Sequence, residues 1–304
     1  MRYLDPKNDL TFKKVFGQHP HLLKSFLNAM LPLPEGEYIE SLEYLPAELV
    51  PQIPLLKYSI VDVRCKDNKG RQFIVEMQMF WTDSFKHRIV FNAAKTYVMQ
   101  LDKAEKFHSL QPVYALCLVN EIFEPQLEQF YHHYQIVHVE DMKKQLEGLE
   151  FVFIELPKFK AQNVSEKKLQ VLWLRYLTEI KDGTVLVNEA LLQTPEIKEA
   201  LDFIQESAFS KGELETYDRY WDSVRCEKTL YYDAEYKGRA EGRAEGRAEG
   251  EKIGFLKTLL YTLRKRKSIK EVTNFADIPL ETVEKLANLL KKYGDKAEEH
   301  LDEI

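Results

Sequence analysis

Apolar positions fall at two spacings, which predict alternating helices and strands over about the first 160 residues. Leu10, Phe12 and Val15 recur at helical spacing directly after Asn8 and Asp9, either of which can cap a first helix. Further segments predict helices at 21–31 and 82–102, and strands at 38–45, 58–65, 72–80, 113–119, 131–139 and 151–156, with a helix between the last two. The predicted fold is therefore α/β, a mixed sheet flanked by helices.

Beyond Ser165 the apolar spacing is helical throughout, so an all-α region should follow the sheet. A further helix should begin near Pro195, and two short helices joined by a turn should close the chain. Pro279 suits the first helical position of the second of these. The patterns divide the chain into a core at 1–160, a helical extension at 161–236, a repeat segment at 237–254 and a small helix-turn-helix-like module at 255–304.

The segment from Gly238 to Gly250 repeats Gly-Arg-Ala-Glu three times. A four-residue period drifts by about 40° per repeat on an α-helix, so the glycines form a slowly winding stripe. Like charges, not opposite charges, lie four residues apart within one helix, and each glycine costs about 1 kcal/mol relative to alanine. Two such helices can instead approach closely along the stripe. The repeat is therefore either an oligomerisation helix, giving a homodimer or higher homo-oligomer, or a flexible linker.

Four basic residues, at 264–267, precede the last two predicted helices. This arrangement is typical either of DNA contact by a helix-turn-helix or of a packing module with a solvated basic run. Glu281 and Glu284 on the final helix favour the packing module, because carboxylates repel DNA phosphates.

Candidate chemistry is concentrated in a predicted hairpin between residues 58 and 80. Its turn ends in Gly70, a residue type that tolerates the left-handed backbone of a short hairpin loop. If paired residue numbers sum to 138, Asp62 lies opposite Glu76, roughly 5 Å away. Two carboxylates this close repel each other, and a divalent cation with oxygen ligands would offset the repulsion. Gln78 projects from the same face as Glu76.

Two other interpretations of this pattern stay open. Charged residues on the outer face of a half-exposed strand are usually only solvated. A register shifted by one residue would place Asp62 opposite Val75 instead of Glu76. A metal site therefore requires more support than the spacing alone gives.

Resemblance to a known family supplies that support. Asp62, then a hairpin, then Glu76-Met77-Gln78 resembles the D…ExK core of the PD-(D/E)XK nuclease superfamily, with Gln78 in place of the lysine. More closely, the chain is similar to the bacterial transposase-like, recombination-promoting nucleases, in which E-x-Q is common. That similarity spans almost the whole chain and rests also on 9–17, 25–28, 88–97, 154–158 and the glycine-spaced repeat. It implies a restriction-endonuclease-like sheet and metal-dependent cleavage of DNA.

The resemblance also implies roles for individual residues. Asp62 and Glu76 would bind Mg²⁺ or another divalent cation with the Met77 backbone carbonyl, and Gln78 would complete the catalytic set. An amide can orient water but carries no charge, so the rate of cleavage is a separate question. Asp9 either caps the first helix or adds a metal ligand. Contacts with DNA phosphates are expected from Lys13, Lys14, Arg88 and Tyr97, of which Tyr97 is also consistent with a place in the core.

Composition narrows the class of protein. Charged residues make up 30% and hydrophobic residues 44%, with no apolar run of 18, which predicts a globular chain without a transmembrane helix. The N-terminus is too polar for a signal peptide. Three scattered cysteines without a Cys-x-x-Cys pair argue against zinc and disulfides and fit a reducing cytoplasm. The net charge of −6 does not support strong nonspecific DNA binding, although residues 1–100 carry 13 Lys and Arg against 11 Asp and Glu.

Two functions follow as hypotheses. The first is a Mg²⁺-dependent DNA endonuclease, acting as a homo-oligomer in recombination, mobile-element or phage-defence biology. The alternative is a catalytically weak or inactive nuclease fold that serves as a DNA-binding or protein-interaction module. ATPase, esterase and dehydrogenase activities are disfavoured, because the chain has no P-loop, G-x-S-x-G or dinucleotide-binding glycine motif.

Overall fold

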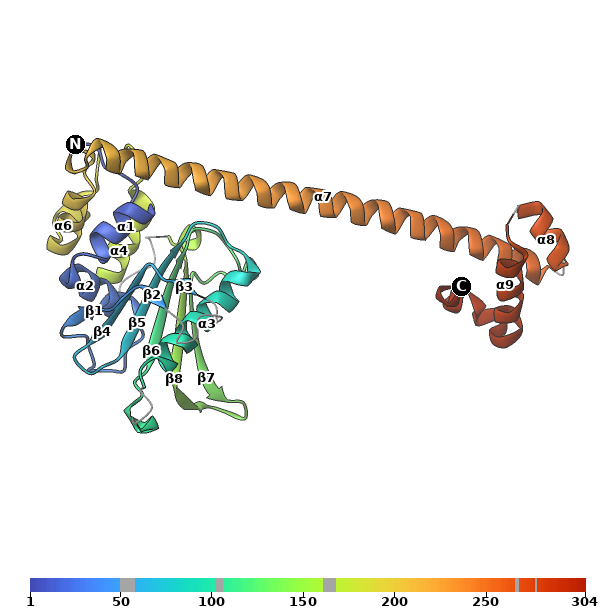
Figure 1. The fold of residues 1–304 in the computed structure, drawn as a ribbon, viewed down its shortest axis with the longest axis horizontal. Coiled ribbons are helices and arrows are strands. Elements are labelled where there is room, and N and C mark those ends of the chain that lie inside the picture. The colour runs from blue at the N-terminus through green and yellow to red at the C-terminus, as the bar shows by residue number, and fades with distance from the viewer. Residues whose placement is uncertain (50–57, 102–105, 161–167, 266–267, 277) are drawn as a thin grey trace. The chain divides into compact units, whose positions relative to one another are not determined.

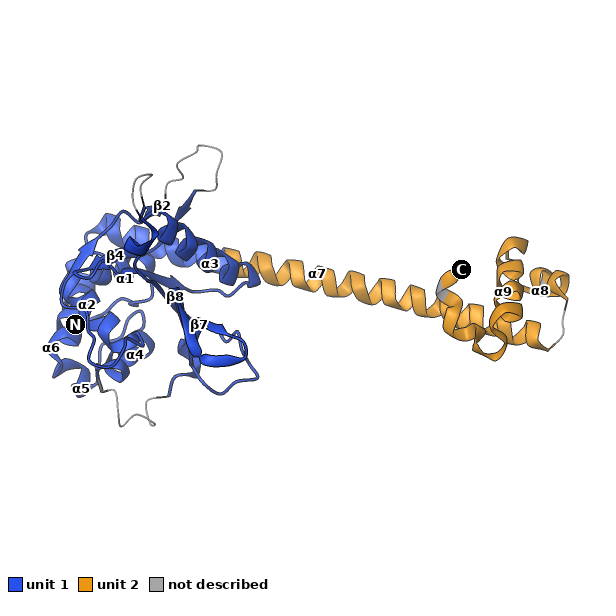
Figure 2. Ribbon diagram, turned by 90° about the horizontal axis from the view of Figure 1, so that it is seen from below, with its two compact units in different colours: residues 1–226 blue, residues 227–304 orange. Residues whose placement is uncertain are grey.

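The computed structural model describes residues 1–304 except 50–57, 102–105, 161–167, 266–267 and 277. The chain forms two compact units, Met1–Cys226 and Glu227–Ile304 (Figure 2). The expected α/β core followed by an all-α region is confirmed (Figure 1). The expected start of the helical region, Ser165, lies outside the described residues. One long helix, α7 (Lys211–Arg264), contributes residues to both units.

Unit 1 is built on a mixed six-stranded sheet with strand order β1-β4-β5-β6-β8-β7. The three strands β5, β6 and β8 run parallel, and the other neighbours pair antiparallel. The strands of this sheet are β1 (Leu42–Tyr44), β4 (Val63–Asp67), β5 (Gln72–Gln78), β6 (Val113–Val119), β7 (Tyr131–His138) and β8 (Asp141–Glu155). A separate two-stranded sheet joins β2 (Glu48–Leu49) to β3 (Ser59–Ile60).

The strand predicted at 113–119 is confirmed as β6, in which every residue is buried because helices cover both faces of the sheet. The helix predicted between the last two strands is wrong. The chain instead turns directly from β7 into β8, which begins at Asp141, and the two strands pair antiparallel. Residues 142–147 are exposed and mostly polar, so their side chains carry no strong periodic signal, and pairing with β7 decides their conformation.

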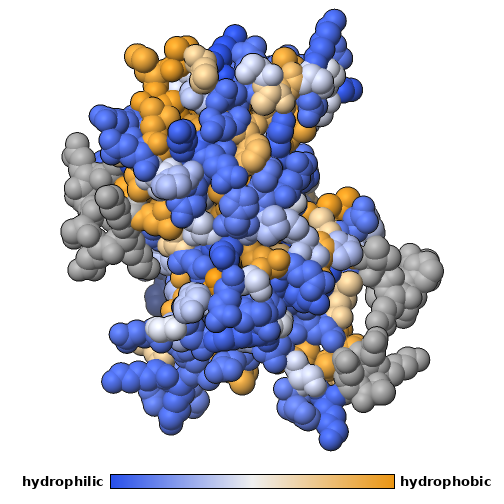
Figure 3. Space-filling model, turned by 90° about the vertical axis from the view of Figure 1, so that its left-hand side faces the viewer, coloured by the Kyte–Doolittle hydropathy of each residue, from blue (hydrophilic) through white to orange (hydrophobic). Residues whose placement is uncertain are grey.

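Helices form a layer on each face of the sheet (Figure 1). On one face α3 (Asp83–Val98) buries Phe85, Ile89 and Ala93 against Ile74 and neighbouring residues of β6. On the other face pack α1 (Asp9–Phe16), α2 (Pro20–Met30), α4 (Lys168–Glu179), α5 (Glu189–Leu192) and α6 (Pro195–Phe203). The molecular face drawn in Figure 3 is mainly hydrophilic, with hydrophobic side chains in small separate patches.

Unit 2 has a small helical core of its own. The C-terminal end of α7 packs Leu259 and Leu260 against α8 (Ile269–Ala276), α9 (Leu280–Tyr293) and the 3₁₀ segment Gly294–Glu303. The two predicted closing helices are confirmed, although Pro279 directly precedes α9 instead of opening it. Arg264, from the basic run, forms an ion pair with Glu298 at 3.0 Å, which fits the packing interpretation of this module. DNA contact by the module stays a prediction.

Candidate active site

The hairpin of β4 and β5 adopts the predicted register. Val63 pairs with Val75 and Lys66 with Gln72, so paired residue numbers sum to 138. Gly70 in the turn has φ of 84°, a conformation that glycine adopts without strain. The alternative register, shifted by one residue, is therefore excluded.

Asp62 lies one residue before β4 and, by extension of this register, opposite Glu76. Its Oδ2 accepts a hydrogen bond from the Met77 N–H at 2.7 Å. In a regular ladder Val61 would exchange hydrogen bonds with Met77, but the Val61 N–H donates to the Ala47 carbonyl at 3.0 Å. The Asp62 side chain thus takes the place of the Val61 carbonyl as acceptor for the Met77 N–H. This bond holds the Asp62 carboxylate beside Glu76, and the Met77 carbonyl lies on the same edge of β5 as the Met77 N–H.

Glu76 is buried on the sheet face that α3 covers, with 4% of its surface exposed. Its Oε1 forms no hydrogen bond with any residue that the structure describes. Burial, and then the neighbouring Asp62 carboxylate, raise the pKa of Glu76 to about 8. Burial also raises the pKa of Asp62, against the lowering effect of the Met77 N–H. The pair is thus held close together at a cost that a cation would offset.

Two cationic side chains face this carboxylate pair. Lys13 of α1 forms an ion pair with Asp9 at 2.7 Å, and its charge lowers the pKa of both Asp62 and Glu76. Arg88 of α3 lowers the same two pKa values and donates to Gln78 Oε1 at 2.9 Å. The structure therefore brings together Lys13, Asp62, Glu76, Gln78 and Arg88 from α1, the hairpin and α3.

The family model for PD-(D/E)XK nuclease family transposases matches residues 6–230, well over half of the chain. The chain belongs to this family. No curated protein and no solved structure matches it. Membership of this PD-(D/E)XK family indicates that the protein has a nuclease-type function and that its substrate is DNA. None of the helices that the structure describes has the length and apolarity needed to cross a membrane.

Lys14 and Tyr97, the other two predicted phosphate contacts, lie in other surroundings, whereas Asp9 lies close enough to raise the pKa of Asp62. Lys14 donates to the Ala208 carbonyl at 3.1 Å and lies over the Phe209 ring, so it faces the helical extension. Tyr97 packs with the α3 cluster. Asp9 does not cap α1, because Asn8 accepts the capping hydrogen bond from Leu10 N–H at 3.0 Å. Phosphate contact by Lys14 or Tyr97 stays a prediction without support from position.

Metal binding by Asp9 has no support from the arrangement of ligands either. Within the described part of the chain, no three His, Cys, Asp or Glu side chains are close enough together to hold a metal ion. The ion pair with Lys13 instead occupies the Asp9 carboxylate. Two carboxylates and backbone oxygen are thus the protein ligands that this site offers.

Sequence reasoning missed Asn92, a fully buried residue of α3. Its amide lies near the Glu76 carboxylate and favours the charged form of that group. The available signal was a polar residue at a core-facing position, four residues after Arg88 and three after the buried Ile89. Such a residue in an apolar helical stripe indicates either a buried hydrogen bond or a site.

Glu155, which the family resemblance covered without assigning a role, is a second buried carboxylate. It accepts hydrogen bonds from the N–H groups of Phe123 and Glu124 at 2.5 and 3.0 Å and bonds His132 at 2.8 Å. Lys158 forms an ion pair with it. Burial acts to raise the pKa of Glu155, but these partners outweigh it and lower the pKa overall. This network is saturated by the protein, so it is structural.

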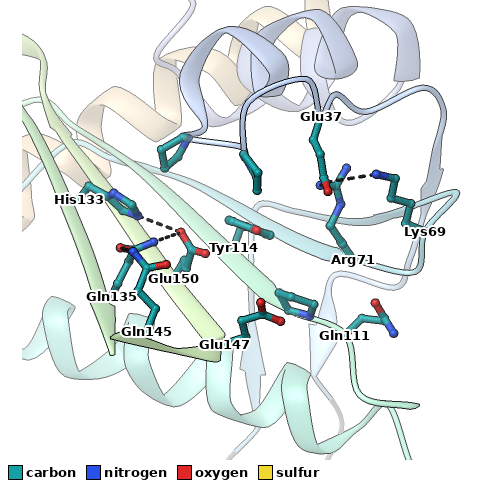
Figure 4. A pocket seen from close by; sticks show the side chains of 13 residues that line it. Glu37, Lys69, Arg71, Gln111, Tyr114, His133, Gln135, Gln145, Glu147 and Glu150 are labelled. Carbon is teal, nitrogen blue, oxygen red and sulfur yellow. Dashed lines mark hydrogen bonds and ion pairs between the residues drawn. The ribbon is translucent and has the colours of Figure 1, made fainter. Parts of the chain in front are cut away.

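A polar cavity of about 580 Å³ opens on the sheet face opposite Glu76 (Figure 4). Tyr114 lies between two groups of charged side chains. On one side Arg71 forms an ion pair with Glu37 at 2.6 Å, and on the other His133 bonds Glu150 at 2.9 Å. Lys69 also forms an ion pair with Glu37, and neither Asp62 nor Glu76 lines this cavity.

Proposed function

We propose that this protein is a metal-dependent DNA endonuclease that hydrolyses phosphodiester bonds at the Asp62–Glu76 pair. The observation that carries the proposal is the buried Glu76 carboxylate, which has one oxygen without a partner among the described residues. A buried polar oxygen without a partner is costly, and an ionised one is more costly still. Structural carboxylates are normally saturated, as Glu155 is in the same unit.

The donor set fits a hard divalent cation such as Mg²⁺, which prefers oxygen ligands and uses one or two carboxylates with water. Asp62, Glu76 and the Met77 carbonyl are the groups that would hold it. When bound, such a cation lowers the pKa of a water molecule and stabilises negative charge on a phosphate. Asp62 and Glu76 position that chemistry, and the Met77 N–H fixes the Asp62 carboxylate while it occurs.

Gln78 occupies the position of the family's lysine and contributes no charge. The Arg88 guanidinium bonds its amide oxygen at 2.9 Å, so α3 brings a positive charge to this side of the site. Lys13 brings another from α1. We propose that Gln78 orients water or a phosphate oxygen, while Arg88 and Lys13 bind the phosphates of DNA.

The alternative function is a weakly active or inactive nuclease fold that binds DNA or a protein. The observation that favours it is Gln78, because the amide cannot replace the charge of a lysine.

The nuclease proposal also includes a role in recombination, mobile elements or phage defence, and a cytoplasmic location. The latter is supported by three cysteines that form no disulfide.

Nicking of supercoiled plasmid separates the two functions. The full-length protein is expected to convert the plasmid to open circles in Mg²⁺ or Mn²⁺, and excess EDTA should stop the reaction. Agarose gels with time points measure the rate. Plasmid that stays supercoiled in every divalent cation, while the protein still shifts DNA in a gel, would support the binding module instead.

We further propose that α7 forms a homodimer through its glycine repeat. The repeat is helical, and added Cβ atoms at Gly238, Gly242, Gly246 and Gly250 would meet no described atom within 4 Å. Arg239 forms an ion pair with Glu235 and Arg247 with Glu251, and both glutamates lie outside the repeat. The face between the Arg and Glu rows is therefore open to a second helix.

Charge favours a parallel pair. At about 100° per residue, Arg lies about 100° to one side of each glycine and Glu about 60° to the other side. A two-fold axis along a parallel pair sets the Arg row of one helix against the Glu row of its partner, whereas an antiparallel pair sets like charges together. Rows of residues four apart pack best at a crossing angle of about −50°.

Substituting leucine at Gly246 is expected to weaken the dimer by at least about tenfold, because the side chain keeps the helices apart. Leucine favours the helix by about 1 kcal/mol over glycine, so the effect cannot come from helix loss. Light scattering on the full chain over a concentration series measures the mass. Ala244→Leu, on the far side of the helix, is the matched control and should remain dimeric. Equal masses for both variants and wild type would refute pairing at the glycines.

A further inference from the structure

Asn92 is a polar residue of α3 whose whole side-chain amide has no partner in the described part of the chain. It has no exposed surface, and neither Nδ2 nor Oδ1 forms a hydrogen bond with a described residue. Its neighbours Ile89 and Ala93 are apolar and pack into the cluster beneath α3. Burying an unpaired amide costs roughly 1–3 kcal/mol, so a residue kept here without a structural bond requires another explanation.

The nearby acceptor is the Glu76 carboxylate, whose Oε1 is likewise buried and unpaired among the described residues. An amide N–H is a donor, and an ionised carboxylate oxygen is an acceptor. The two unsatisfied groups are therefore complementary, and they come from facing elements, α3 and β5. The Asn92 amide lies near enough to Glu76 to lower the pKa of its carboxyl.

We propose that Asn92 is a positioning residue for Glu76, donating a hydrogen bond from Nδ2 to Oε1 while the carboxylate holds a cation. The bond holds the other carboxylate oxygen toward Asp62. This inference rests on the proposed function. Hydrogen bonds to a ligating carboxylate orient it, and their loss typically lowers metal affinity by about 10- to 100-fold.

Asn92→Leu tests the proposal, because leucine is similar in size and removes both polar atoms. Mn²⁺ affinity of the full chain, measured by isothermal titration calorimetry, is expected to fall by about 10- to 100-fold. The melting temperature in EDTA should stay the same or rise, because an unpaired buried amide has been removed. A purely structural residue gives the opposite pair of results, with lower stability and unchanged affinity.

Thr96→Val is the matched control. Thr96 lies one turn further along α3, is fully buried, and its Oγ1 is also unpaired among the described residues. Valine has nearly the same shape, so this variant also removes a buried polar group from the same helix. Its Mn²⁺ affinity should equal that of wild type, because Thr96 is not among the groups acting on Glu76.

Three results would overturn the role of Asn92. Wild-type Mn²⁺ affinity in folded Asn92→Leu refutes the positioning bond alone, whereas no Mn²⁺ binding by wild type refutes the metal site as well. If the leucine variant does not fold, Asn92→Ser and Asn92→Ala are compared, since both create a cavity and only serine keeps a donor. Tighter Mn²⁺ binding by the serine variant supports the proposal, and equal binding refutes it.

Discussion

Asp62→Asn and Glu76→Gln are each expected to reduce Mg²⁺-dependent plasmid nicking by roughly 1,000-fold or more. Each variant keeps the shape of the side chain and removes one of the two negative charges that would hold the cation. Removing one group that stabilises the charge of a transition state lowers the reaction rate by about 100- to 1,000-fold. The loss is larger when the group acts as a unit with its neighbours. Initial rates of nicking at saturating Mg²⁺ measure the loss.

The same Glu76→Gln change is expected to stabilise the metal-free protein at high pH. The pKa of Glu76 is about 8 in the folded chain against 4.5 ordinarily, because of burial and Asp62. The contribution of the protonated Glu76 carboxyl to the free energy of unfolding is fully present below pH 4.5 and is lost as pH rises through about 8. Glutamine does not ionise, so urea denaturation in EDTA should show the variant gaining a few kcal/mol on wild type between pH 6 and pH 9.

Glu150→Gln is the control for both measurements. Glu150 lies on the opposite face of the sheet, bonded to His133 at the polar cavity, and it is not part of the proposed site. Its variant should nick plasmid at the wild-type rate. Nicking by Asp62→Asn and Glu76→Gln at that same rate would remove these residues from the catalytic role.

Glu155→Gln is expected to lower the free energy of unfolding by about 3–5 kcal/mol, the largest stability effect we predict. The carboxylate has no exposed surface and accepts bonds from Phe123, Glu124 and His132, with Lys158 as its counter-ion. Glutamine would leave the buried ammonium of Lys158 without its counter-charge. Urea denaturation at pH 7 measures the loss.

The pH dependence of this effect has the opposite sign to that of Glu76. The pKa of Glu155 is lowered from 4.5 in the folded chain, because hydrogen bonds and Lys158 outweigh burial. Its contribution is present above pH 4.5 and is lost as pH falls through the folded value. The half-buried pair of His133 and Glu150 is the comparison, and Glu150→Gln should cost less than about 1 kcal/mol. Equal losses in both variants would contradict the assigned role of Glu155.

Much of the core and the carboxylate pair could be predicted, because local chemistry decides them. The continuous apolar run of β6 requires cover on both faces. The turn at Gly70 sets the register that brings Asp62 opposite Glu76. Family resemblance then gave these two residues a meaning that spacing alone did not.

Features that depend on distant partners were not predictable. The Met77 N–H bonds Asp62 where a regular ladder would use Val61, whose own N–H donates to the carbonyl of Ala47, the residue directly before β2. Asn92 lies near Glu76 because α3 packs on that face of the sheet, and no local sequence pattern predicts how closely the two side chains approach. The β7–β8 hairpin was missed because its exposed residues take their conformation from pairing across the turn.

Because the Gly-Arg-Ala-Glu units of α7 are identical, the helix can gain or lose a unit without changing the local pattern of its surface. Adding one four-residue unit extends a helix by about 6 Å and turns the following residues by about 40°. Yet every glycine keeps its offset from the arginine and glutamate beside it, since each unit has the same sequence. Copies of the gene that gain or lose a unit through slippage would therefore encode chains that keep the proposed pairing surface of α7.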